Sequence, residues 1–183
     1  MAVARATGWK RVDAVIAAVS ALPPGLCRLD VYGEGPQLGR LRLLADQLGG
    51  PVRLHGHVSD LHRRLADADL LVSGSQQEGF GRAVAEAAAL GVPAAVPAGG
   101  ASGELVLHGL TGWVYDPADP TTLPRLLADV AAMPAAELAA MGDRARIRAA
   151  GVFTPERCAA EYLDVCHAAV TAQTTICGAG DAA

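Results

Sequence analysis

The chain has 183 residues, of which 51% are hydrophobic and only 4% aromatic, and its net charge is −4 at pH 7. This length suits one domain with its own core. The acidic balance, with a pI of about 5.7, argues against a nucleic-acid-binding protein, for which a clustered basic surface is typical. No apolar run approaches the length of a membrane span, and we expect no signal peptide because the first residues lack an apolar stretch.

Short apolar runs alternate with stretches in which apolar residues recur at helical spacing. In chain order this pattern predicts a strand at 1–5, a helix at 12–22, a strand at 27–33, a helix at 37–48, a strand at 52–54, a helix at 61–66, a strand at 70–73, a helix at 81–90, a strand at 93–96, a glycine-rich loop that ends at Gly103, a strand at 113–115, and helices at 122–132, 135–150 and 155–171. The alternation predicts the α/β fold class, with a Rossmann-like doubly wound parallel sheet. We expect residues 1–172 to form this domain and residues 173–183 to be a disordered tail, because the tail has no pattern.

The four cysteines are Cys27, Cys158, Cys166 and Cys177, and their spacing matches neither a C-x-x-C pair nor a metal site. Cys158 and Cys166 fall eight positions apart on an expected helix, which favours packing over a disulfide. We therefore expect reduced thiols and a cytoplasmic location.

The most informative segment runs from Glu78 through Gly-Phe-Gly to Glu86, after an expected strand and into an expected helix. The first N–H groups of a helix attract anions, because they lack backbone partners and carry a partial charge of roughly +0.5. Carboxylates beside such a site would accept hydrogen bonds from hydroxyl groups of the same ligand. A phosphate joined to a polyol is a nucleotide sugar, so the segment indicates that ligand class. The alternative is that both glutamates are ordinary helix residues, since Glu is a good helix former.

The segment Ser75-Gln-Gln-Glu-Gly-Phe-Gly81, together with Glu86, resembles the Glu-x7-Glu motif of retaining glycosyltransferases with the GT-B fold. That group includes bacterial mannosyltransferases, glucosyltransferases and sucrose synthases. Further segments resemble the same family, in order, along nearly the whole chain: 31–36, 55–58, 86–93, 99–100, 104–106, 109–113 and 153–157. The resemblance implies a single GT-B half-domain, the C-terminal half that binds the sugar donor.

The resemblance implies roles for four charged residues. Arg5 and Lys10 would hold the donor diphosphate, Arg5 by paired hydrogen bonds and Lys10 as a point charge. Glu86 would accept hydrogen bonds from both ribose hydroxyls, and Glu78 from hydroxyls of the transferred sugar. Arg5, Lys10 and Glu78 are thus the expected catalytic residues.

Glycines and backbone atoms complete the expected site. The N–H groups of Phe80 and Gly81 would help to hold the sugar, and Gly79 and Gly81 would let the backbone approach it because they have no Cβ. The ring of Phe80 is an equally good candidate for packing under the loop. Gly33 and Gly35 would allow a tight turn beside the nucleotide.

The nucleotide base would lie at Gly56, His57 and Val58, where the family contacts it mostly through backbone atoms. His55 and His57 do not predict a metal site, because no third ligand lies near them in sequence. The resemblance implies that cations and backbone donors bind the phosphates, so we expect neither a metal nor a cofactor besides the nucleotide-diphospho-sugar donor. A dinucleotide cofactor is disfavoured because Leu38 stands where that fingerprint has its third glycine.

The acceptor-binding half of a GT-B enzyme would precede Arg5, where this sequence has only four residues. We therefore expect the chain to bind a nucleotide sugar but to transfer it poorly alone, because half a cleft cannot position an acceptor. The expected partners are a nucleotide sugar and either a separate acceptor-domain polypeptide or a second copy, with neither nucleic acid nor membrane. Two alternatives stay open: a non-catalytic nucleotide-sugar-binding subunit or truncated remnant, and a half-domain of a sugar-nucleotide epimerase.

Overall fold

Parallel strands and the helices between them make up the computed structural model, which describes the backbone of residues 1–178 and the side chains of residues 1–171. The strands are β1 (Ala2–Val3), β2 (Leu29–Tyr32), β3 (Val52–Gly56), β4 (Leu71–Val72), β5 (Ala94–Pro97) and β6 (Gly112–Tyr115). The helices are the short 3-10 helix η1 (Gly8–Lys10), α1 (Val12–Ser20), α2 (Leu38–Leu48), α3 (Leu61–Ala66), α4 (Arg82–Ala89), α5 (Ser102–Leu105), α6 (Thr122–Ala132), α7 (Ala135–Val152) and α8 (Pro155–Gly178). The predicted alternation of strands and helices is confirmed.

The strand order reverses in the middle of the sheet. β1, β2 and β3 pair in parallel in that order, and so do β4, β5 and β6. The two sets meet at β1 and β4, where the N–H of Val72 donates to the carbonyl oxygen of Met1 at 2.8 Å. The spatial order is therefore β3-β2-β1-β4-β5-β6, the order of Rossmann-like domains, whose ligands bind at the carboxyl ends of strands beside the reversal.

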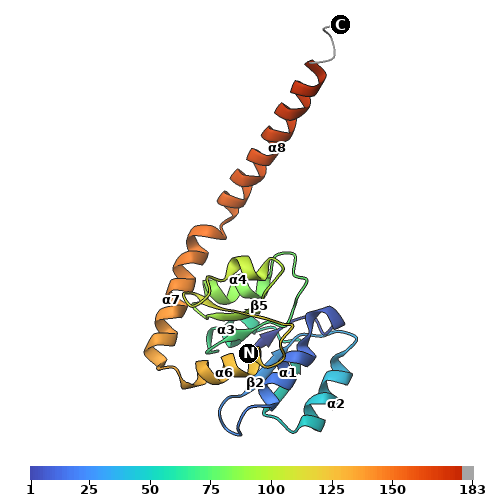
Figure 1. Cartoon of the computed structure of the whole chain (residues 1–183), viewed down its shortest axis with the longest axis vertical. Coiled ribbons are helices and arrows are strands. Elements are labelled where there is room, and N and C mark those ends of the chain that lie inside the picture. The colour runs from blue at the N-terminus through green and yellow to red at the C-terminus, as the bar shows by residue number, and fades with distance from the viewer. Residues whose placement is uncertain (179–183) are drawn as a thin grey trace.

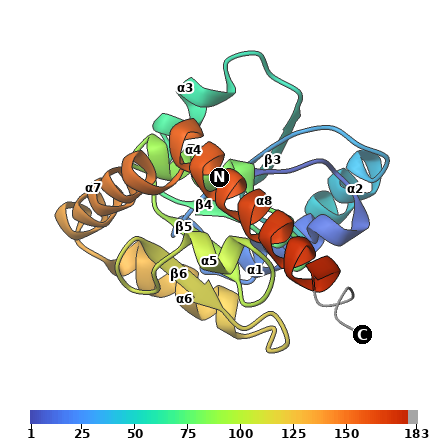
Figure 2. The ribbon, with the colours of Figure 1, turned by 90° about the horizontal axis from the view of Figure 1, so that it is seen from above.

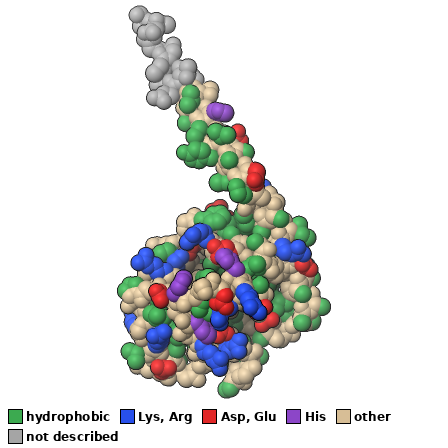
Figure 3. Space-filling model, turned by 180° about the vertical axis from the view of Figure 1, so that it is seen from behind, with side chains coloured by type: hydrophobic (Ala, Val, Ile, Leu, Met, Phe, Trp, Pro, Cys, Tyr) green, Lys and Arg blue, Asp and Glu red, His purple; other side chains and the backbone are tan. Residues whose placement is uncertain are grey.

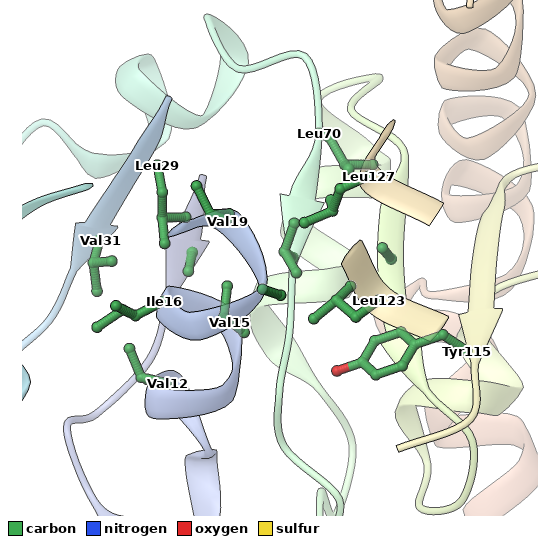
Figure 4. Packing of buried hydrophobic residues seen from close by; sticks show 14 of the residues in the cluster. Val12, Val15, Ile16, Val19, Leu29, Val31, Leu70, Tyr115, Leu123 and Leu127 are labelled. Atoms are coloured by element: carbon green, nitrogen blue, oxygen red, sulfur yellow. The ribbon is translucent and has the colours of Figure 1, made fainter. Parts of the chain in front are cut away.

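Successive side chains of the central strands point to two cores, one on each face of the sheet. Val72 and Ala95 belong to the first core, with Val15 and Ile16 of α1. Figure 4 shows the side chains of α1 between those of β2 on one side and those of α6 on the other. This core fixes the start of α1, and with it the loop that leads from β1 into that helix.

The second core lies on the opposite face of the sheet. Leu71 and Val96 meet Val84 and Ala87 of α4 there, and α4 in turn packs against α7. Figure 2 shows α7 beside α4, with α2 at the opposite end of the domain. The two cores make the sheet doubly wound, as predicted.

Helix α7 touches the end of α4 through glycine. A Cβ on Gly142 would lie 2.0 Å from the carbonyl oxygen of Gly91, which follows α4. The backbones of the two segments are therefore in direct contact, and α7 fixes the position of the helix that carries Glu86.

Helix α8 projects away from the rest of the chain (Figure 1). Tyr162, Leu163 and Val165 on this helix are 70%, 54% and 68% exposed. Among the described residues, no helix is both long and apolar enough to cross a lipid bilayer.

Helix α8 is longer than the helix predicted at 155–171. Helix α8 continues through residues 173–178, which the sequence analysis assigned to the tail, while residues 179–183 lie outside the described residues. Ala172 and Gln173 are good helix formers, and neither Pro nor Gly follows before Gly178, so nothing in the sequence ends the helix earlier.

Two short helices are absent from the sequence-based prediction. Helix η1 forms in the loop after β1, and α5 begins at Ser102, inside the expected glycine-rich loop. Elements of three or four residues are too short to produce a recognisable hydrophobic period.

Candidate functional site

A cavity of about 750 Å³ lies at the carboxyl ends of β1 and β4, where the strand order reverses. Its volume falls in the range of about 300–1,000 Å³ that is typical of small-molecule sites. Figure 3 shows cationic, acidic and histidine side chains close together on one face of the domain. Ten of the twelve residues that the sequence analysis places in the site line the cavity, namely Arg5, Lys10, Gly33, His57, Val58, Glu78, Gly79, Phe80, Gly81 and Glu86, whereas Gly35 and Gly56 do not.

The two predicted cations lie on the loop that leads from β1 to α1. Lys10 is the last residue of η1, and Arg11 after it has φ 47° and ψ 39°, a left-handed conformation that is uncommon outside glycine. The segment that follows β4 packs against this turn, since a Cβ on Gly74 would lie 2.4 Å from the carbonyl oxygen of Arg11. The backbone on which Lys10 sits is therefore fixed by close contact with the neighbouring strand.

Gly33 and Gly35 support the cation-bearing loop from the side of β2. Their φ angles are 129° and 155°, and a Cβ on them would lie 2.0 Å from the carbonyl oxygen of Ala4 and 2.6 Å from that of Ala6. Gly33 also lines the cavity, whereas Gly35 does not. The glycines predicted for a tight turn thus let two backbone segments touch, and Gly35 acts behind the cavity wall.

The acidic side of the cavity begins with Glu78, on the loop after β4. Its carboxylate Oε2 lies 2.5 Å from the Nζ of Lys10, and the two side chains are 18% and 14% exposed. The N–H of Ala101 donates to the Glu78 carbonyl oxygen at 3.0 Å, and a Cβ on Gly100 would lie 3.0 Å from the Gln76 carbonyl oxygen. The glycine-rich segment before α5 therefore holds the loop of Glu78 in place.

Glu86 lies on α4 and faces the segment that follows β3. The Nε2 of His62 is 3.7 Å from the Glu86 carboxylate, and His57 and Val58 line the same part of the cavity. The Glu86 side chain is 38% exposed, so it can accept hydrogen bonds from a ligand.

The loop between the two glutamates contains two glycines with different surroundings. A Cβ on Gly79 would have no neighbour within 4 Å, so this position is open. Gly81 has φ 88°, and a Cβ there would lie 2.8 Å from the Oγ of Ser102. Gly81 is thus required by the fold itself at the start of α4. Phe80 is 48% exposed and packs edge-on against Phe153 at 6.1 Å between ring centroids.

Four further residues contribute to the cavity, and the sequence analysis assigned none of them to the site. Trp9 lies beside Lys10, whose Nζ is 4.0 Å from its ring centroid, and His62 faces Glu86. Arg82 begins α4 and Gly74 follows β4, and both line the cavity. Trp9 and Arg82 stand next to predicted residues in sequence, which is the one signal that could have found them.

No group of three or more His, Cys, Asp or Glu side chains suited to a metal ion gathers within the described part of the chain. The expectation that phosphate binding needs no metal stays a prediction, based on Arg5 and Lys10.

Tyr115 anchors the end of β4 at the cavity wall. Its hydroxyl donates to the Ser73 carbonyl oxygen at 2.8 Å, and burial raises the pKa of Tyr115 from 10.0 to about 12. We expect Tyr115→Phe to lower the free energy of unfolding by about 1 kcal/mol, the usual contribution of one intramolecular hydrogen bond. Urea denaturation at neutral pH measures this loss.

The same substitution should change the alkaline limb of the stability profile. A raised pKa in the folded state means that the stabilising contribution of Tyr115 is complete below pH 10.0 and is lost as the pH rises to about 12. Tyr115→Phe should lack that part of the decline, and the exposed Tyr162→Phe should keep it. Parallel pH profiles for all three proteins would contradict the prediction.

The strand order defines a Rossmann-like domain, and the cavity at its reversal is lined by both cations and carboxylates. The sequence model of the family described as glycosyl transferases group 1 matches residues 1–148, and the chain belongs to this family. Its fold is that of one half of a GT-B glycosyltransferase.

Curated relatives are much longer than this chain. The chain is 36% identical over 151 residues to an exopolysaccharide phosphotransferase of Streptomyces coelicolor, which covers 78% of the chain and 15% of that protein. It is 36% identical over 84 residues to the GtfA subunit of a UDP-N-acetylglucosamine–peptide N-acetylglucosaminyltransferase of Streptococcus gordonii, which covers 45% of the chain and 16% of that protein.

Solved structures show the same fold. HepE of Anabaena, in complex with UDP and glucose, superposes with a TM-score of 0.78 at 25% identity, over 90% of this chain and 48% of that one. The catalytic domain of a cholesterol-α-glucosyltransferase from Helicobacter pylori superposes with a TM-score of 0.72 at 21% identity, over 82% of this chain and 97% of that one. The chain thus spans about half of the length of HepE.

Proposed function

We propose that this domain binds the nucleoside diphosphate sugar from which a glycosyltransferase takes its sugar. One observation carries the proposal: the cavity at the strand-order reversal is lined by the cations Arg5 and Lys10 and by the carboxylates Glu78 and Glu86. Cations suit a diphosphate, and carboxylates suit the hydroxyls of a ribose and a sugar.

The positions of the side chains suggest how the donor lies. The diphosphate would lie against the loop of Arg5 and Lys10, and the transferred sugar would lie beside Glu78 and the open Gly79. The ribose would lie at Glu86, with the base toward Val58 on the segment after β3. UDP is the first nucleotide to test, because the HepE structure at 25% identity holds UDP.

The same residues suggest how the sugar leaves its donor. When the bond between the anomeric carbon and the phosphate oxygen breaks, its electron pair stays on the diphosphate. The positive charges of Arg5 and Lys10 would stabilise that developing charge. We accordingly propose transfer without a metal, and the family resemblance supports retention of the anomeric configuration.

An acceptor would need binding groups from outside this domain, because the cavity lies at the surface of a half-domain. We propose that a second structural unit supplies them, either in the same polypeptide or in a partner. The cysteine spacing, which favours reduced thiols, supports a cytoplasmic location.

We expect Glu86→Ala to weaken nucleotide binding about 10- to 100-fold, the effect of losing one or two charge-assisted hydrogen bonds to the ribose. Isothermal titration calorimetry of the purified chain with UDP, GDP and ADP provides the measurement and identifies the base. Glu137→Ala, at an exposed position on α7, is the matched control and should bind like the unmodified chain. If no nucleotide binds, or if Glu86→Ala binds as well as the control, the proposed function is wrong.

A further inference from the structure

Lys10 and Glu78 form an ion pair, although the proposed function assigns Lys10 to the diphosphate and Glu78 to the sugar. Lys10 comes from the turn after β1 and Glu78 from the loop after β4, 68 positions apart in sequence. Both side chains are largely buried, at 14% and 18% exposure, so water screens their attraction only in part. The pair therefore affects any anion that binds beside it.

The backbones that carry Lys10 and Glu78 are each held in place, so that only the two side chains can rearrange. The turn that carries Lys10 packs against Gly74, where a Cβ would lie 3.1 Å from the Lys10 carbonyl oxygen. The loop that carries Glu78 is held by the hydrogen bond from Ala101. Because both backbones are fixed, the two charges stay within reach of each other.

The charges predict that a diphosphate and Glu78 compete for Lys10. A diphosphate at Lys10 would share the ammonium with Glu78 and would also meet the negative charge of that carboxylate, which disfavours binding. Arg5 has no ion pair among the described residues, so it would attract the diphosphate without such an opponent.

A sugar attached to the diphosphate would change this balance. Its hydroxyls would donate hydrogen bonds to Glu78 and so draw the carboxylate away from Lys10. The ammonium, which has three donor hydrogens, could then turn to the phosphate oxygens.

We propose that Glu78 discriminates between the nucleotide sugar and the nucleoside diphosphate, by holding Lys10 whenever no sugar occupies Glu78. This inference rests on the proposed function and deepens it. Glu78 both recognises the sugar of the donor and weakens the binding of the product that remains after transfer. The pair thereby favours product release.

The test compares UDP with UDP-glucose on four forms of the chain: unmodified, Glu78→Gln, Lys10→Met and the double variant. Glutamine keeps the shape of the side chain but removes its charge. We expect Glu78→Gln to bind UDP about three- to tenfold more tightly than the unmodified chain, since a repulsive charge is lost. It should gain no affinity for UDP-glucose, because the hydrogen bonds of the sugar to a charged acceptor are lost too.

The Lys10→Met variant tests whether the expected gain in UDP affinity depends on Lys10. In the Lys10→Met background, the Glu78→Gln substitution should tighten UDP binding less than it does alone. Glu137→Gln, on the exposed face of α7, is the charge control and should leave both affinities unchanged.

The outcomes separate this inference from the proposed function. If the unmodified chain binds UDP and Glu78→Gln binds it no more tightly, the inference is wrong while the proposed function stands. If no form binds UDP, GDP or ADP, both are wrong. If GDP or ADP binds in place of UDP, that diphosphate and its glucose conjugate are compared in the same way. A second measurement needs no ligand: urea unfolding of the four forms should give a non-additive double-mutant cycle, and additive effects would overturn the inference as well.

Discussion

Gly33→Ala should destabilise the domain by about 3–5 kcal/mol and weaken nucleotide binding at least tenfold, because it combines an overpacked contact with a strained backbone. The added Cβ would lie 2.0 Å from the carbonyl oxygen of Ala4 and 2.9 Å from its carbonyl carbon. Both are backbone atoms, so no flexible side chain can move aside. The φ of 129° also lies in a region that alanine rarely adopts.

The neighbouring hydrogen bonds extend the effect to the cavity. The N–H of Gly33 donates to the carbonyl oxygen of Gly56 at 2.8 Å, and the N–H of Ala4 donates to that of Tyr32 at 3.0 Å. A displaced Gly33 therefore moves β3 and the loop of Arg5 together.

Gly25→Ala is a control that introduces backbone strain without a steric clash. Gly25 has φ 84°, is exposed, and would have no atom within 4 Å of an added Cβ. We expect this control to lose only about 1 kcal/mol, the strain of a left-handed alanine, and to keep its nucleotide affinity. Urea denaturation and calorimetric titration of both variants measure the difference, and equal losses would contradict the role assigned to Gly33.

Gly142→Ala is the second substitution with a large expected effect. It should lower the stability of the domain, although helix propensity alone favours alanine over glycine. In an open helical position, alanine stabilises by about 0.5–1 kcal/mol relative to glycine. At Gly142 the new Cβ would lie 2.0 Å from the Gly91 carbonyl oxygen and 3.5 Å from the Cδ of Pro93. We expect a net loss of about 2–3 kcal/mol, because overpacking exceeds the gain in propensity.

Gly151→Ala in the same helix is the matched control. An added Cβ at Gly151 has no neighbour within 4 Å, so this variant should be slightly more stable than the unmodified chain. Thermal or urea unfolding of the two variants should move in opposite directions. A stabilised Gly142→Ala would show that α4 and α7 can separate freely, contrary to the close backbone contact described here.

The fold was predictable because its elements have clear periods and ends. Pro23, Pro24 and Gly49 mark helix ends in the sequence, and the apolar run at 70–73 predicted the central strand β4. The short helices η1 and α5 were not predictable from a period, and the projection of α8 depends on packing that no local pattern encodes.

Family resemblance predicted residues that the structure brings to one cavity, but it did not predict their contacts. Glu78 and Glu86 belong to one motif, and Arg5 and Lys10 have a recognisable spacing. The ion pair between Lys10 and Glu78 spans 68 residues and depends on the pairing of β1 with β4, which no sequence pattern shows. The tight contact of Gly74 with Arg11 is of the same kind, because it joins two loops that only the fold brings together.

The junction between β1 and β4 also has a kinetic consequence. The hydrogen bond from Val72 to Met1 closes a loop of about seventy residues, and contacts of such long range form slowly because the entropy of loop closure opposes them. The local helices and the β2–β3 pair involve shorter separations. We therefore expect the junction between β1 and β4 to form late in folding. Nucleotide binding should then return only in the slowest refolding phase, after most of the helical circular dichroism signal has returned.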